Sequence, residues 1–311
     1  MCFDTTSSNT GKNKGSCVLL ERKLGKNLFW LACRHHIFEL VIGAAFQAVL
    51  PSAISGPDNR IFVRFQSYWS EIDQSTYITA NPTIILRIAD KKRNDIVSFC
   101  QIKQVRDDYR ELLELSIIFL GKEPTRGIRC MTPFATSNAR WMSMVIYYLK
   151  IFMFSEKFNL NVKEKKGLAE IYIFIVTVYI KNWFTASFAI YAPNNDLQLM
   201  KTLINYDSPD ISNATVKKMM GHLWYLSDEL VGLCLFDQNV LVETKCKVVH
   251  AMINNPSQEV RDVRPKIKKH DLEKLRLHDL ANQNTMRIFI EFCVEIFWEY
   301  YGKYYGKLER F

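Results

Sequence analysis

The order of apolar and polar positions predicts a mostly helical chain with a small mixed part at its start. Apolar residues recur at helical spacing over 17–24 and 37–50, and a continuous apolar run at 28–33 lies between them. A short run of this kind, bounded by polar residues, is typical of a buried strand. Gly25 follows the first helical pattern, where a left-handed C-terminal cap is common. These features predict a helix–strand–helix unit, preceded by a strand that ends at Asp4.

Beyond residue 60 helical patterns dominate the chain, and we find no internal repeat. The predicted helices share apolar positions three and four residues apart and cover 61–69, 95–120, 138–154, 168–190, 196–205, 213–236, 239–253, 271–281 and 284–301. A charged turn is expected at 163–166. We therefore expect a mainly α protein with a small α/β part, divided into a core at 1–50, a helical segment at 51–130 and a helical domain at 131–311.

The composition is that of a globular, basic protein. The 311 residues are 48% hydrophobic and 23% charged, and 41 Lys and Arg against 32 Asp and Glu give a net charge of +9. Such an excess is compatible with nucleic-acid binding, although many basic proteins bind none. The eight cysteines form no CxxC pair, and the first residues lack the apolar run of a secretory signal. We expect reduced thiols and a nuclear or cytoplasmic protein that is not secreted.

One stretch has the apolarity of a membrane segment without its length. Residues 171–180 are nearly all apolar, but Glu170 and Lys181 bound them. This leaves about ten residues where roughly twenty are needed to span a bilayer. We expect a buried core helix here, and no membrane partner.

The start of the chain carries an acidic residue where some enzymes hold metal ions. Metal-dependent phosphoryl transferases of the ribonuclease H-like fold carry a carboxylate at the C-terminal end of a central strand. Two carboxylates there hold two divalent ions, which activate the attacking oxygen and stabilise the leaving one. Asp4 ends the predicted first strand, and the polar loop 5–11 follows it. Asp is also common as a turn residue or a helix N-cap, so both interpretations stay open.

The residues after Asp4 stand in an order that resembles a known family. A polar loop, a helix and a strand follow, and the strand ends in a Cys-x-x-His. The residues that carry this order are Asp4, Asn9, Gly11, the helix at 17–24, Cys33 and His36. The order and spacing resemble the middle of the catalytic core of hAT-type DNA transposases and of cellular proteins derived from them. The resemblance implies a partial ribonuclease H-like core at 1–50, followed by a large helical domain.

The resemblance also assigns roles to individual residues. It makes Asp4 the second catalytic aspartate, a ligand of a divalent ion such as Mg²⁺, and places Cys33 and His36 close to the catalytic centre. By residue type alone the Cys-x-x-His could bind a metal, but two ligands without a second pair do not make a tetrahedral site. Other histidines, such as His222, lie far along the chain. We expect Cys33 to be buried and His36 to be hydrogen-bonded at the strand-to-helix junction.

A weaker match lies at 139–143. Its sequence, Ala-Arg-Trp-Met-Ser, is similar to the Arg-Trp-Asn-Ser element that begins a helix in the same family. Met142 departs from the usual Asn. The resemblance implies that Arg140 and Trp141 are structural residues near the site.

The family's metal site needs two further acidic residues, for which the chain offers weak matches. Only three residues precede Asp4, so we expect the first aspartate to be missing. For the late glutamate, Glu229 in a helical pattern and Glu309 in a Glu-Arg pair match in residue type alone. One carboxylate binds divalent ions weakly. We expect a degenerate or domesticated fragment, truncated at both ends and without catalytic activity or a cofactor, with Mg²⁺ at Asp4 only if a residual site survives.

Basic residues gather around the first predicted helix and favour contact with a phosphate backbone. They are Lys12, Lys14, Arg22, Lys23 and Lys26. Further basic clusters lie at 91–93 and 261–269. With the resemblance, these residues make double-stranded DNA the expected partner. The alternative is that the charged segments are simply solvated.

The last helical pattern is amphipathic. Glu291, Glu295 and Glu299 recur at a spacing of four, opposite an apolar stripe that begins at Phe289. An exposed apolar face of this kind predicts self-association. Two alternative functions stay open: a helical protein-interaction module with incidental basic charge, and a metal-dependent nuclease or transposase that uses Glu229 or Glu309.

Overall fold

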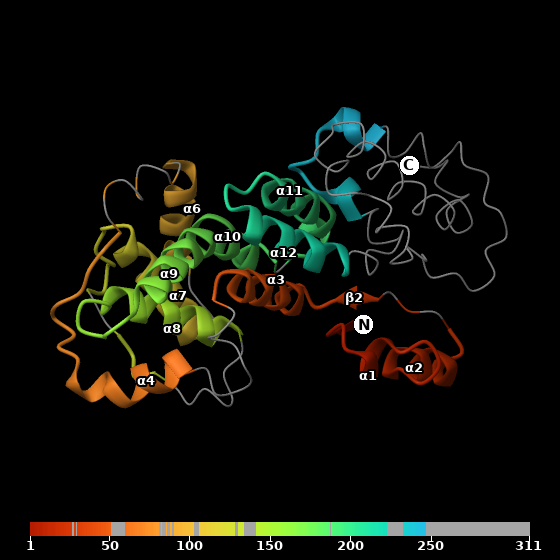
Figure 1. Ribbon diagram of the computed structural model, residues 1–311. Coiled ribbons are helices and arrows are strands. Elements are labelled where there is room, and N and C mark those ends of the chain that lie inside the picture. The colour runs from red at the N-terminus through yellow and green to blue at the C-terminus, as the bar shows by residue number, and fades with distance from the viewer. Residues whose placement is uncertain are drawn as a thin grey trace. The chain divides into compact units, whose positions relative to one another are not determined.

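The structure is a computed structural model that describes the greater part of the chain up to residue 246. The described residues are 1–26, 28, 30–50, 60–80, 82, 85, 88, 90–102, 106–127, 130–133, 141–186, 188–222 and 233–246; for 60, 90–93 and 141–143 it describes the backbone alone. Figure 1 shows that helices make up most of this part. The predicted fold class, mainly α with a small α/β part, is confirmed for the described residues.

The elements follow one another in a simple order. The strands are β1 (Cys2–Phe3) and β2 (Leu31–Ala32). The α-helices are α1 (Ser7–Thr10), α2 (Ser16–Leu24), α3 (Arg34–Val49), α4 (Arg60–Tyr68), α6 (Asp90–Gln101), α7 (Asp107–Phe119), α8 (Trp141–Met153), α9 (Val162–Phe174), α10 (Ile180–Phe184), α11 (Ala192–Ile204) and α12 (Pro209–Met220). Shorter helical segments are η2 (Trp69–Glu71), η4 (Ile175–Tyr179), η5 (Ala189–Tyr191) and η7 (Leu233–Phe236).

The chain divides into two compact units. The first comprises residues 1–37, 185–207 and the described residues from 215 onward; the second comprises 38–184 and 208–214. The first unit holds the two strands and both short N-terminal helices. The second unit holds the larger set of packed helices.

The first unit begins with a parallel strand–helix–strand arrangement. β1 and β2 pair in parallel, with Cys2 opposite Leu31 and Phe3 opposite Ala32. Helices α1 and α2 lie in the crossover between the strands, as a parallel pair requires. The small core beneath them consists of Cys17, Val18 and Trp30, with Met1 and Phe3 packed against it. The carboxyl ends of both strands therefore lie at the same edge.

Helix α2 begins and ends where its sequence predicts. Gly25 adopts a left-handed conformation, φ 63°, and its backbone N–H donates to Arg22 and Glu21. Gly15, just before the helix, has a different reason to be glycine: a Cβ there would lie 2.5 Å from the backbone N and O of Gly11. The loop before α2 is thus folded tightly upon itself. The predicted helix at 17–24 is confirmed.

The predicted strand at 28–33 is wrong in length. Among the described residues of this run, Leu31 and Ala32 alone pair with β1, because β1 itself is two residues long. Trp30 is buried beside the strand, where its ring meets that of Phe3 edge-on at 5.3 Å between centroids. The apolar run therefore indicates burial correctly, but it does not indicate the extent of strand pairing.

The second unit has a dense aromatic and aliphatic core. All residues of α7 from Glu111 to Phe119 are buried. Phe46 stacks on Tyr148 at 4.3 Å between ring centroids, and Phe62 meets Tyr148 edge-on at 4.6 Å. These contacts join α3, α4 and α8 into one core. Large ring surfaces contribute strongly to the stability of such a core.

The helix predicted at 95–120 in this unit needs correction. The single helix expected at 95–120 is two helices, α6 and α7, and Arg106 is an extended N-cap before the second. Asp107 and Asp108 occupy the first turn of α7, where the helix dipole favours acidic side chains. The apolar spacing alone does not reveal this boundary.

The charged turn expected at 163–166 is instead the first turn of α9. Asn161 accepts a hydrogen bond from the backbone N–H of Glu164 at 2.8 Å, and the Glu164 side chain accepts one from the Asn161 backbone at 2.9 Å. This is a capping box, which satisfies two backbone donors at the helix start. Lysines 163, 165 and 166 are therefore exposed helical residues.

The apolar stretch at 171–180 lies inside a helix that begins and ends six residues earlier than the helix predicted at 168–190. α9, the π-helical segment η4 and α10 run continuously through Val162–Phe184, 23 residues. Within the described part of the chain this is the one helix long and apolar enough to cross a membrane by length and composition. The structure buries 61% of its most apolar window, as it would for a core helix.

Candidate functional site

Asp4 lies directly beyond β1, at the carboxyl end of the parallel pair. Its Oδ1 accepts hydrogen bonds from the backbone N–H of Thr6 at 3.0 Å and from the side-chain amide of Asn9 at 2.8 Å. The hydroxyl of Thr6 donates to the same oxygen. These contacts make an Asx turn that leads into α1. Three donors therefore converge on one carboxylate oxygen, and Oδ2 receives none of these three bonds.

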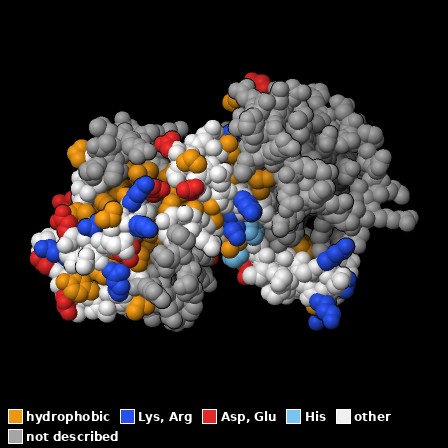
Figure 2. Space-filling view, viewed as in Figure 1, with side chains coloured by type: hydrophobic (Ala, Val, Ile, Leu, Met, Phe, Trp, Pro, Cys, Tyr) orange, Lys and Arg blue, Asp and Glu red, His pale blue; other side chains and the backbone are white. Residues whose placement is uncertain are grey.

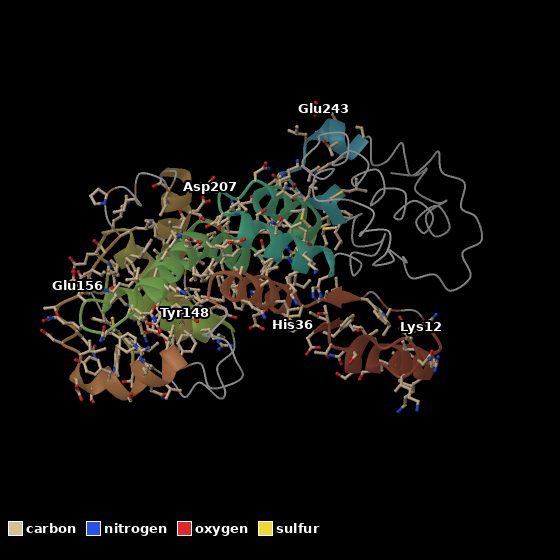
Figure 3. All side chains as sticks on the ribbon, viewed as in Figure 1. Lys12, His36, Tyr148, Glu156, Asp207 and Glu243 are labelled. Carbon is tan, nitrogen blue, oxygen red and sulfur yellow. The ribbon has the colours of Figure 1, made fainter. Side chains whose placement is uncertain are left out.

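The Cys-x-x-His lies at the equivalent end of the neighbouring strand. The backbone N–H of Cys33 donates to the carbonyl of Phe3 at 2.7 Å, which extends the ladder to the residue before Asp4. Helix α3 begins immediately afterwards, at Arg34, and His36 lies in its first turn. Figure 3 labels His36 at this helix start. Cys33 is half-buried, so the expectation that it is buried is wrong.

Arg34, between the Cys and the His, anchors the start of α3. Its guanidinium forms a bidentate ion pair with both carboxylate oxygens of Asp196 on α11. The side chains are only 10% and 4% exposed. A fork of two charge-assisted bonds fixes orientation as well as position. The pair holds the backbone that carries His35 and His36.

His222 joins the site from the end of α12. Its Nδ1 lies 3.2 Å from Oγ1 of Thr5, across a sequence separation of 217 residues. Burial is the main cause that lowers the pKa of His222 to about 4, and the nearby charges of Lys218 and His36 lower it further. A neutral His222 therefore faces Thr5 at ordinary pH. The sequence offers no signal for this contact, because nothing local couples the two positions.

The electrostatics of Asp4 follow from its turn. The hydrogen bond from the Thr6 side chain is the largest cause that lowers the pKa of the Asp4 carboxyl. The hydrogen bond from the Thr6 backbone acts in the same direction, burial opposes both, and the Asn9 amide and the charge of His36 lower the pKa further. Asp4 is therefore an ionised carboxylate surrounded by donors and a histidine.

The fit of a metal ion can be tested on these side chains. Among the described residues, the groups that shift the pKa of Asp4 include no second carboxylate, and one oxygen of Asp4 already accepts three hydrogen bonds. Mg²⁺ prefers several oxygen ligands in octahedral geometry. Throughout the described ranges, no three His, Cys, Asp or Glu side chains come together closely enough to hold a metal ion. The described residues do not fit a two-metal centre.

The predicted basic residues all lie on the surface around α2. Lys12 and Lys14 lie in the loop before the helix, Arg22 and Lys23 in its last turn, and Lys26 just after it. All five side chains are exposed. Figure 2 shows Lys and Arg atoms gathered over this region, and Figure 3 labels Lys12 there.

The segment that carries these basic residues has one acidic residue, and its side chain is turned inward. Between Thr5 and Cys33 the only acidic residue is Glu21. Its Oε1 accepts hydrogen bonds from the indole N–H of Trp30 at 2.8 Å and from the backbone N–H of Leu28 at 3.0 Å. The carboxylate therefore ties α2 to the segment before β2. The five outward cations form a basic surface without an acidic neighbour on the outer side of the same helix.

Several predicted site residues fall outside the described residues. Glu229, Glu309, Arg140 and the amphipathic segment 284–301 belong to this group, as does the basic cluster at 261–269. Trp141 begins α8, but its side chain is not described. The structure thus brings together Asp4, Cys33 and His36 from the predicted set.

Comparison with known proteins supplies no relative: no protein family, curated protein or solved structure matches the chain.

Proposed function

We propose that this chain is a degenerate or domesticated derivative of an hAT-type transposase that binds double-stranded DNA without cleaving it. The observation that carries the proposal is the parallel pairing of β1 and β2. Asp4 and Cys33 follow these two neighbouring strands, and this supports the likeness to a ribonuclease H-like fold, which carries a catalytic carboxylate at the carboxyl end of a central strand. The helix-dominated remainder agrees with a core followed by a helical domain.

The environment of Asp4 supports binding over catalysis. A two-metal mechanism needs carboxylates that converge on the ions. Asp4 instead commits one oxygen to three hydrogen bonds within its own turn, and the charge of His36 lowers the pKa of its carboxyl. Its present role is to shape the loop that leads into α1.

The basic surface around α2 supports DNA as the partner. Five exposed cations lie within and beside one helix, and the single acidic residue, Glu21, is committed to Trp30 and Leu28. Cations that neutralise phosphates release condensed counterions, so binding of this kind is strongly salt-dependent. No base-reading motif is needed for such backbone contact.

A second candidate function is a helical protein-interaction module. The observation that favours it is the exposure of Leu19, Leu20 and Leu24 on α2. Aliphatic side chains form neither ion pairs nor hydrogen bonds with a phosphate backbone. In this alternative the basic charge is incidental, and DNA binding is absent at low salt.

The test is a salt titration of binding to a short DNA duplex, read by fluorescence anisotropy with the full chain. We expect binding at about 50 mM salt that weakens linearly in log–log form. A variant with Lys12→Glu, Lys23→Glu and Lys26→Glu should lower the slope by about 0.9 for each phosphate that it no longer neutralises. Its matched control reverses Lys163, Lys165 and Lys166, which are equally exposed on α9.

Two results would contradict the proposal. Absence of binding at low salt favours the protein-interaction module. Equally weakened binding in the α2 variant and the α9 control shows that net charge alone attracts DNA, with no specific surface.

A further inference from the structure

Helix α2 carries an exposed apolar face as well as its cations. Leu19, Leu20 and Leu24 are 50%, 41% and 50% exposed, whereas Cys17 and Val18 on the other side are buried in the small core. Three leucines exposed to this degree on a nine-residue helix form an apolar surface of the kind that marks interaction sites. A partner that accepts aliphatic groups fits this face.

The arrangement of charge around these leucines restricts what that partner can be. Lys23 lies one turn after Leu19, and Arg22 directly precedes Lys23. The loop residues Lys12 and Lys14 lie before the helix, and Lys26 lies after it. Lys and Arg stems can lie along an apolar surface while their charged heads reach outward. The surface thus combines aliphatic side chains with positive charge: Lys23 lies between Leu19 and the Leu20–Leu24 pair, and the other cations lie at the edges of this surface.

We propose that α2 binds the surface of a membrane containing anionic lipids, with its three leucines entering the headgroup region and its cations contacting lipid phosphates. Interfacial helices carry this combination of Leu on one side and Lys or Arg around it. Charge complementarity with an anionic bilayer is direct, because Glu21 is withdrawn to Trp30. The contact is peripheral and needs no spanning segment, so the proposal departs from the expectation of no membrane partner, which was drawn from the length of the apolar stretch at 171–180. It goes beyond the proposed DNA binding, which requires the same cations but not the leucines.

The exposed leucines also underlie the alternative of a protein partner, but their arrangement favours a bilayer over a specific protein groove. Protein–protein interfaces concentrate binding energy in aromatic and arginine anchors that fill shaped pockets. The outward face of α2 presents aliphatic side chains on either side of Lys23, and its helix is only nine residues long. Such a face can partition into a fluid interface without matching any particular shape. The extended anionic surface of a bilayer can also contact the cations at both ends of the helix at the same time.

The experiment is flotation of the full chain with vesicles of phosphatidylcholine alone and of phosphatidylcholine with about 30% phosphatidylserine, a content that gives a strongly negative surface. We expect binding to the anionic vesicles that weakens with salt, and none to the neutral ones. Leu19→Ser, Leu20→Ser and Leu24→Ser together should reduce the partition coefficient at least about tenfold, because each substitution removes the apolar transfer energy of a leucine. Leu20→Trp should strengthen binding, since Trp favours the membrane interface.

The matched control replaces three exposed apolar residues of the second unit: Val63→Ser, Ile102→Ser and Val162→Ser, which are 46%, 61% and 84% exposed. This control should bind the vesicles like the wild type. The proposal is overturned if the anionic vesicles do not bind the chain, if the leucine and control variants weaken binding equally, or if Leu20→Trp binds no more tightly than the wild type.

A parallel DNA titration separates this proposal from the previous one. The triple leucine variant should keep its DNA affinity while its vesicle binding falls. Vesicle binding without DNA binding removes the DNA proposal and leaves the membrane proposal standing. DNA binding without vesicle binding removes the membrane proposal and leaves the DNA proposal standing.

Discussion

Lys150 Nζ lies 2.6 Å from Oε1 of Glu111, and the two side chains are 2% and 4% exposed. The pair also holds a neighbouring segment: Lys150 donates to the carbonyl of Met131, and Glu111 accepts from the Met131 backbone N–H at 3.0 Å. Burial is the largest cause that lowers the pKa of Lys150, while the charge of Glu111 opposes it. Helices α7 and α8 are thus joined by a buried ion pair.

The first prediction concerns this buried pair. Lys150→Met leaves the Glu111 carboxylate buried without its cation, and we expect a loss of about 3–5 kcal/mol in the free energy of unfolding. Urea unfolding followed by circular dichroism measures it. The double variant Lys150→Met/Glu111→Leu should be less destabilised than Lys150→Met, because no charge remains buried. A single variant as stable as the wild type would show that the pair contributes nothing.

The second prediction concerns the start of α3. Asp196→Asn removes the charge that fixes the Arg34 guanidinium, and both side chains are nearly excluded from water. We expect a loss of about 3–5 kcal/mol in the free energy of unfolding, the usual cost of breaking a buried ion pair by removing one partner. Asp107→Asn is the control, because its pair with Arg110 is 3.8 Å long and Asp107 is 85% exposed. The control should change stability by at most about 1 kcal/mol; similar losses in both variants would contradict the assignment.

The third prediction is a pH dependence that originates at His222. Its pKa falls from 6.5 to about 4 on folding, so the folded state favours the neutral ring. The unfolded chain binds the proton first, and stability is therefore full above pH 6.5 and falls as the pH drops from 6.5 towards 4. His222→Gln should flatten this part of the profile. The measurement is urea unfolding at a series of pH values; an unchanged profile in the variant would assign the dependence to other groups.

The fourth prediction concerns catalysis at Asp4. We expect no cleavage of double-stranded DNA in the presence of Mg²⁺ or Mn²⁺, because three donors hold one oxygen of Asp4 and no second carboxylate from the described ranges acts on it. A plasmid-nicking assay with the purified chain measures this. Metal-dependent cleavage that disappears in Asp4→Ala and persists in Asp73→Ala, a second Asx-turn aspartate, would show that the site is active.

Part of the fold can be read from local patterns. The sequence predicts the helix at α2 together with its glycine stop, because Gly25 adopts a conformation that other residues avoid. It also predicts the helix after Cys33, although that helix begins three residues earlier than its apolar pattern. Periodicity misplaces the start of α9, because the capping box of Asn161 and Glu164 lies in polar residues that a hydrophobic pattern ignores.

The candidate site is only half visible in the sequence. Asp4, Cys33 and His36 stand out by their order along the chain, and the parallel strands bring Asp4 and Cys33 to one edge. Sequence reasoning misses His222 and Asp196 as partners of Thr5 and Arg34, since each contact spans more than a hundred residues. No local spacing rule connects residues at such distances.

The sequence by itself determined the helical character of this protein, the basic character of α2 and the position of Asp4 at the end of a strand. Those properties depend on neighbours within a few residues, through backbone geometry, side-chain periodicity and charge. Only the tertiary structure decided that Glu21 turns inward, that the leucines of α2 stay exposed and that a histidine reaches Thr5. These outcomes depend on which distant surfaces pack together, and that is set by the burial of the whole chain.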